Sequence, residues 1–90
     1  MPVKISLAAP FQRFTGGKET VFYRAGALSE IISGLDKSYR GLKGAIMDKD
    51  GLKGHIVVLV NDRDVGLLQG LDTLINDGDE VIILPVVAGG

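Results

Sequence analysis

The sequence contains no cysteine and no tryptophan, and its single histidine is His55. Without cysteine the chain has no disulfide framework, no thiolate nucleophile and no thiolate metal site. His55 has no metal-ligating partner at the usual spacing, and the acidic pair Asp48 and Asp50 lacks the later ligands of a calcium loop. We therefore expect no metal site, and any sulfur chemistry must use sulfur from another molecule.

A strong excess of charge and a long apolar run are also missing. Ten basic residues stand against eleven acidic ones, for a net charge of −1, and the lysines are scattered. The sequence therefore shows no basic cluster that would attract nucleic acid or an anionic membrane. The longest apolar run, 81–88, is far below the ~20 residues that span a bilayer, and no signal-peptide pattern precedes it. We expect a cytoplasmic protein that binds neither nucleic acid nor a membrane.

The first half of the chain predicts two strands and a helix. Residues 3–7 alternate apolar and polar side chains, which is typical of a half-buried strand. Residues 18–25 are rich in β-branched and aromatic side chains and predict a second strand, antiparallel to the first, after a loop at 10–17. Residues 27–42 show helical spacing, in which Gly34 indicates close packing and Gly41 a left-handed cap. The apolar stripe of this helix consists of Leu28, Ile31, Ile32, Leu35 and Tyr39.

The second half predicts two further strands around a polar turn. Residues 55–61 form a β-branched run, and the turn at 61–64 leads into a hairpin or a short return strand. Residues 80–88 are the last strand. The remaining expectations are a loop or short turn at 43–54, a short helical turn over Leu71, Leu74 and Ile75, and a tight turn at Asp77-Gly78.

This order of elements predicts an α+β fold. One main helix between the second and third strands packs on one face of a mixed four- to five-stranded sheet, the β-grasp arrangement, and leaves the other face open. Partners would dock on the open face. Strand alternation allows two places for Phe22, Leu59 and Ile82. They lie either on the open face, where they would form a partner-docking patch, or in the core, and the sequence does not decide between the two.

The last strand runs directly into Gly89-Gly90. Pro85 lacks a backbone donor and marks the point where the strand leaves the sheet, so we expect a domain at 1–85 and an extended tail at 86–90. Such a tail reaches up to roughly 17 Å. Because glycine has no β-carbon, the backbone passes through a narrow channel and the terminal carbonyl carbon stays open to a nucleophile. The sequence therefore predicts acyl activation at the Gly90 carboxylate.

Two segments carry a resemblance to a known family. Residues 60–65 (VNDRDV) and especially 77–90 (DGDEVIILPVVAGG) resemble the MoaD/ThiS family of ubiquitin-like sulfur carriers. The length and the ILPVVAGG ending are most similar to the longer CysO-type carriers and to archaeal small modifier proteins. The predicted order of elements is also that of the family, so the resemblance extends over the whole chain.

The resemblance implies a mechanism. A ubiquitin-activating-like adenylating enzyme would use ATP to adenylate the Gly90 carboxylate, and sulfur transfer would convert it to a thiocarboxylate for a sulfur-accepting synthase. Gly89, Ala88, Val87 and Val86 would thread the partner's active site. The carrier would be a substrate and not an enzyme, with no catalytic residue, no intrinsic cofactor and, when alone, a monomeric state.

Several alternatives stay open. Extra sequence at 42–54 sets the chain apart from the shortest thiamine-type carriers. Leu84 and Val86 stand where molybdopterin-type carriers have aromatic or proline character, so that branch is less favoured. The sulfur could still serve cysteine, molybdopterin or thiamine synthesis or tRNA thiolation. The chain could instead be a protein modifier joined through Gly90 to lysines, or a non-covalent binding subunit.

Overall fold

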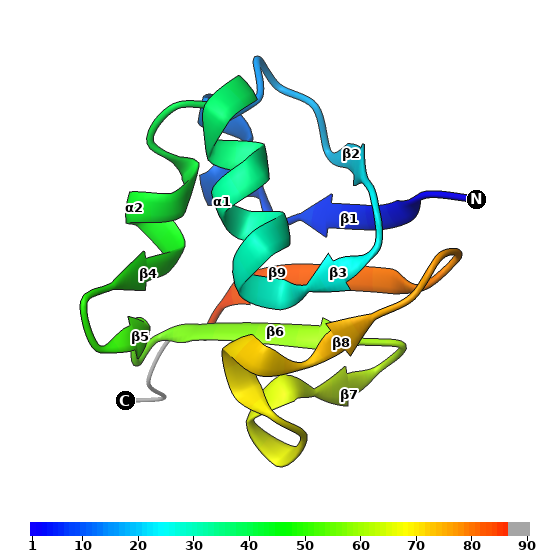
Figure 1. Cartoon of the computed structure of the whole chain (residues 1–90). Coiled ribbons are helices and arrows are strands. Elements are labelled where there is room, and N and C mark those ends of the chain that lie inside the picture. The colour runs from blue at the N-terminus through cyan, green and yellow to red at the C-terminus, as the bar shows by residue number, and fades with distance from the viewer. Residues whose placement is uncertain (87–90) are drawn as a thin grey trace.

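The computed structural model describes residues 1–86, in which a five-stranded mixed sheet carries one long helix across one of its faces (Figure 1). The strand order is β2-β1-β9-β6-β7. Strand β9 lies at the centre and runs parallel to β1, whereas the other neighbouring strands run antiparallel. This is the predicted α+β, β-grasp arrangement with five strands. The strands are β1 (Val3–Leu7), β2 (Thr20–Tyr23), β6 (Ile56–Val60), β7 (Arg63–Asp64) and β9 (Glu80–Pro85).

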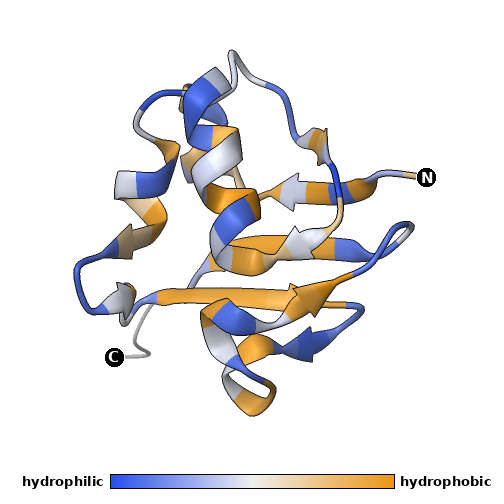
Figure 2. Cartoon of the chain, in the orientation of Figure 1, coloured by the Kyte–Doolittle hydropathy of each residue, from blue (hydrophilic) through white to orange (hydrophobic). Residues whose placement is uncertain are grey.

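The core lies between the sheet and helix α1 (Leu28–Ser38). Four predicted stripe residues of α1 face the sheet because they recur every three to four residues. The fifth, Tyr39, follows the helix as its C-cap and is only partly buried. Every second residue of each strand points toward the helix, as the period of two requires. Figure 2 shows that β6 and β9 are apolar along most of their length, so both faces of these strands carry apolar side chains. The buried side chains of α1 and of the three central strands include Leu28, Ile31, Ile32, Leu35, Val3, Ile5, Leu7, Val58, Val81 and Ile83.

Gly34 lies in the middle of α1 where the helix touches β2. A β-carbon built on Gly34 would come within 1.8 Å of the Tyr23 hydroxyl oxygen. The interpretation of Gly34 as a site of close packing is therefore confirmed, because only a residue without a side chain lets the Tyr23 ring lie against the helix.

The helix ends earlier than the periodicity predicts. Helix α1 stops at Ser38, and Gly41, with φ +97°, begins a second helix, α2 (Leu42–Ile46), rather than capping the first. The reason is the Asp36 side chain, whose Oδ1 accepts hydrogen bonds from the N–H groups of Gly41 (3.1 Å) and Lys43 (3.0 Å). This carboxylate holds the reversal between the helices.

The two segments expected as loops contain regular structure. The segment at 10–17 includes the 3₁₀ helix η1 (Ala9–Phe14), which forms because Phe11 is buried in the core. In the segment at 43–54, α2 is followed by a hairpin, and burial of Leu42 and Ile46 one helical turn apart stabilises α2. The strands of this hairpin are β4 (Met47–Asp48) and β5 (Gly51–Leu52).

The helical turn predicted over residues 71–75 is correct only in its first part. Leu71 belongs to the 3₁₀ helix η3 (Gly70–Asp72), whereas Leu74 and Ile75 form strand β8 (Leu74–Ile75). A long-range contact decides this, because β8 pairs antiparallel with β3 (Gly26–Ala27) just before α1. A further 3₁₀ helix, η2 (Val65–Leu67), follows β7.

Membrane insertion through a helix finds no support in this architecture. None of the helices within residues 1–86 has the length and apolar character needed to cross a bilayer.

Candidate functional site

The face of the sheet opposite α1 carries an apolar strip. Val57 and Leu59 on β6 alternate with core residues, as do Ile82 and Leu84 on β9, so all four point away from the helix. Leu59 is the register partner of Ile82, and Val57 is that of Leu84. These four half-buried side chains therefore form one block, which we call the open-face strip.

The predicted docking patch is only partly contiguous. Phe22, Leu59 and Ile82 all lie outside the core cluster, and Phe22 is 59% exposed. Leu59 and Ile82 are direct neighbours, but Phe22 sits on the edge strand β2 opposite Lys4, with β1 between it and β9.

The sequence interpretation did not include Val57 and Leu84. The signal was available, because each lies two residues from a predicted patch member on the same strand and therefore on the same face.

The tail begins where β9 ends. Pro85 is the last residue of β9 and faces Ile56 on β6, in agreement with its predicted place at the strand end. The strand predicted over 80–88 therefore ends earlier, since Val86 is no longer part of it. The N–H of Val86 still donates to the His55 carbonyl oxygen, at 2.7 Å, while 48% of Val86 is exposed. The sheet thus anchors the chain as far as the Val86 N–H. The predicted acyl site Gly90 and the tail residues Gly89, Ala88 and Val87 lie outside the described residues.

Asn61 and Asp79 belong to the two segments that carry the family resemblance, and they lie at the other end of β9, where the strand begins. Asn61 Nδ2 donates to Asp79 Oδ1 at 3.0 Å, and Asn61 Oδ1 accepts from the Glu80 N–H at 3.0 Å. Asp79 Oδ2 also accepts from the Asn76 N–H at 2.8 Å. These bonds join the turn after β6 to the start of β9. The Asn61 and Asp79 side chains therefore fix the start of the strand that leads to the tail.

His55 is exposed beside the base of the tail, where its carbonyl oxygen accepts from the Val86 N–H. Among the residues that the structure describes, no three side chains of histidine, aspartate or glutamate gather in a way that would hold a metal ion.

The fold and this site define a ubiquitin-like β-grasp protein with an apolar open sheet face and a C-terminal extension of its central strand. The ThiS family model matches residues 5–90, and the chain belongs to that family. The predicted family resemblance is thereby confirmed.

Individual relatives agree over the full length. The sulfur carrier protein CysO of Mycobacterium tuberculosis is 39% identical, with all of both chains covered. Small archaeal modifier protein 3 of Haloferax volcanii is 32% identical, again with full coverage of both. Among solved structures, a chain of the Amycolatopsis orientalis BexX/CysO complex superposes with a TM-score of 0.92 at 35% identity. The match covers 98% of this chain and 99% of that chain.

Proposed function

We propose that this protein is a sulfur carrier that holds sulfur as a thiocarboxylate on Gly90. The observation that carries the proposal is the 39% identity to CysO over the whole of both chains, together with a family match that extends to residue 90. The missing cysteine agrees with a stored sulfur that comes from outside the chain.

The chemistry takes place at one carboxylate. The Gly90 carboxylate oxygen attacks the α-phosphorus of ATP in a partner adenylating enzyme, which releases pyrophosphate and leaves an acyl adenylate. Hydrosulfide then attacks the acyl carbon, the bond from that carbon to the AMP oxygen breaks, AMP departs, and loss of the sulfur-bound proton leaves the thiocarboxylate. Glycine suits both steps because no β-carbon crowds the approach. The chain acts as a substrate and brings no catalytic group or cofactor of its own.

The fold supports the presentation of this carboxylate. Strand β9 is central in the sheet, pairs on both sides and is anchored up to the Val86 N–H. We propose that residues 1–85 form the domain and that residues 86–90 enter the partner's active site. The open-face strip, to which Leu59 and Ile82 belong, and Phe22 on the sheet edge together form the docking surface that orients the tail.

The sulfur acceptor is a synthase of the cysteine type under this proposal. Its support is the 39% identity to CysO of Mycobacterium tuberculosis. The complex of BexX with CysO from Amycolatopsis orientalis supports only the coarser point that such a carrier binds a partner protein. The same carboxylate chemistry would serve a molybdopterin- or thiamine-type synthase, so purification of the partner that consumes the thiocarboxylate distinguishes these acceptors.

The test is the intact mass of the protein purified from its host without reductant, with fragmentation of the last peptide. Oxygen-to-sulfur exchange adds about 16 Da, as does oxidation of Met1 or Met47, so the shift must be located on Gly90. The matched control is the chain without Gly89 and Gly90, which should fold normally and gain no sulfur. A Gly90 that stays unmodified after incubation with ATP, a sulfur donor and the host's adenylating enzyme would contradict the proposal.

A second function is supported by the 32% identity to small archaeal modifier protein 3. The same acyl adenylate, attacked by a lysine amine, would give an isopeptide bond and release AMP. Branched peptides that join Gly90 to lysines of other proteins would favour this modifier function, and their absence from host extracts would leave the carrier function alone.

A further inference from the structure

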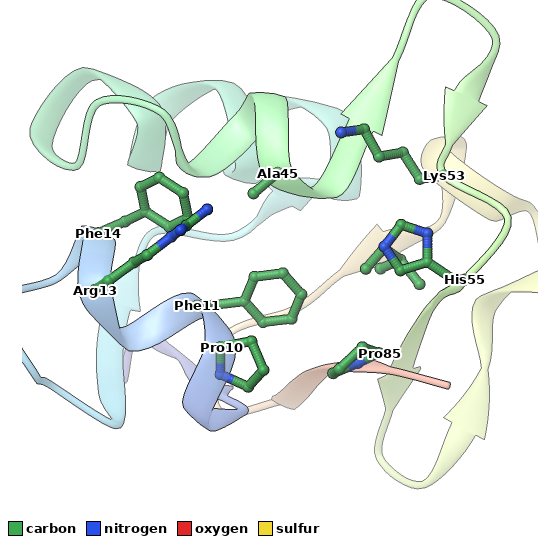
Figure 3. A pocket seen from close by; sticks show the side chains of 9 residues that line it. Pro10, Phe11, Arg13, Phe14, Ala45, Lys53, His55 and Pro85 are labelled. Atoms are coloured by element: carbon green, nitrogen blue, oxygen red, sulfur yellow. The ribbon is translucent and has the colours of Figure 1, made fainter. Parts of the chain in front are cut away.

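A basic pocket lies at the base of the tail and is separate from the open-face strip (Figure 3). Its volume is about 300 Å³. Pro10 and Phe11 of η1, Ile56 of β6 and Pro85 of β9 provide apolar walls. Three further residues, Arg13, Lys53 and His55, bring basic side chains to it. The pocket therefore combines apolar walls with three basic side chains.

The charge of this pocket is one-sided. Its described lining includes Arg13, Lys53 and His55 and no carboxylate, although the whole chain has a net charge of −1. The Arg13 guanidinium lies 4.7 Å from the centre of the Phe14 ring, a cation–π contact that restrains it beside the pocket. In Figure 3 the side chains of Arg13 and Lys53 extend toward each other on either side of Ala45. Both cationic side chains therefore line the same pocket, which would attract a ligand with negative charge.

The position of the pocket connects it to the tail. Pro85 forms part of the wall, and the next residue, Val86, is held by its hydrogen bond to the carbonyl of His55, which also lines the pocket. Consecutive Cα atoms are only ~3.8 Å apart. An enzyme that takes up the residues after Val86 must therefore place the entrance of its channel directly beside this pocket.

We propose that the pocket receives an acidic segment of the activating enzyme, in which Asp or Glu carboxylates pair with Arg13 and Lys53 and an adjoining apolar side chain packs on the exposed Pro10. This inference rests on the proposed function. Arginine binds carboxylates through paired hydrogen bonds, and exclusion of water at the contact strengthens the attraction. Complementary charge beside the channel entrance gives specificity and speeds the encounter of the two proteins.

The experiment measures ATP-dependent activation of the full-length chain by the host's adenylating enzyme. The test variant is Arg13→Glu/Lys53→Glu, and the matched control is Lys37→Glu/Arg40→Glu, which reverses two exposed charges near the end of α1. We expect the KM for the carrier to rise about tenfold or more in the test variant, with kcat within about twofold, and to stay unchanged in the control. Arg13→Gln/Lys53→Gln should show an intermediate rise, and added salt should raise the wild-type KM more than that of the test variant.

Other outcomes overturn the inference. Equal KM values for the test and control variants would show that the pocket takes no part in docking, while activation of wild type would still support the carrier function. A change in the KM for ATP alone would assign the pocket to nucleotide phosphates. A wild-type chain that is not activated at all would contradict the proposed function and this inference with it. Circular dichroism and thermal unfolding of both glutamine and glutamate variants verify that each compared protein is folded.

Discussion

Asn61 and Asp79 are hydrogen-bonded through their side chains at 3.0 Å, although 18 positions separate them in the chain. The same Asn61 side chain accepts from the N–H of Glu80, the first residue of β9. Residues 60–65 and 77–90, which carry the family resemblance, are therefore tied together in space. The bonds lie at the start of β9, whereas the tail leaves from its other end, so this part of the motif serves the fold rather than the acyl chemistry.

Two substitutions of Asn61 should distinguish the stability that its side-chain hydrogen bonds contribute from the cost of its backbone conformation. Asn61 has φ +49°. Asn61→Gly keeps access to that conformation but loses two side-chain hydrogen bonds, for an expected loss of about 1–2 kcal/mol in the free energy of unfolding. Asn61→Ala should lose roughly 1–2 kcal/mol more, because alanine adopts left-handed φ at a cost. Urea denaturation measures both, and equal stability of the two variants would contradict the strain.

The neighbouring turn residue offers a stabilising change. Asp62 has φ +68°, and with Asn61 it forms a two-residue hairpin loop between Val60 and Arg63. Glycine is favoured at the second position of such loops. We expect Asp62→Gly to raise the free energy of unfolding by about 0.5 kcal/mol, since relief of strain exceeds the entropy cost of glycine. Asp62→Ala, which removes the same charge and keeps the strain, should show no gain in thermal unfolding.

Two helical glycines should respond in opposite ways to alanine. Gly44 in α2 has open space where a β-carbon would stand, whereas at Gly34 the Tyr23 ring occupies it. Gly44→Ala should stabilise the protein by roughly 0.5–1 kcal/mol. Gly34→Ala should destabilise it by about 1–3 kcal/mol through overpacking.

A double-mutant cycle identifies the cause of the Gly34 effect. In a Tyr23→Ala background the Gly34→Ala penalty should largely disappear, because the clashing ring is gone. A penalty that stays the same in both backgrounds would assign the effect to something other than this contact.

The open-face strip should matter for binding more than an equally apolar residue elsewhere. Leu59 belongs to the strip, whereas Leu67 in η2 is 86% exposed and is not a member of the strip. If the strip docks the activating enzyme, Leu59→Thr should raise the KM for the carrier about tenfold, the loss expected for one buried aliphatic side chain. Leu67→Thr should leave the KM unchanged. Similar KM values for both variants would place docking elsewhere.

The sequence alone predicted the fold class and most of the sheet. Strand β1, strand β6 and the apolar stripe of α1 could be located because burial of one face imposes a period of two or of 3.6 residues on the chain. The same alternation left Phe22, Leu59 and Ile82 undecided between core and surface. In central strands with apolar residues on both faces, the pattern does not say which face the helix covers.

The parts that failed depend on specific side-chain and strand contacts, of which some join neighbouring segments and others join distant ones. The early end of α1 follows from the Asp36 carboxylate and its two backbone donors, and the strand at Leu74–Ile75 follows from pairing with Gly26–Ala27. Local propensity contains neither interaction. Similarly, η1 forms where Phe11 finds a place in the core, which a count of turn-forming residues cannot reveal.

The sequence by itself determined the absence of thiols, the order of the main elements and the Gly-Gly ending that the family resemblance places at the acyl site. Only the tertiary structure decided that the open-face strip is a block of four apolar side chains and that Arg13, Lys53 and His55 meet beside Pro85. The physical reason is strand pairing. Arg13 and Pro85 lie 72 positions apart in the chain (85 − 13), and the pairing of β9 with β1 and β6 brings these two segments together.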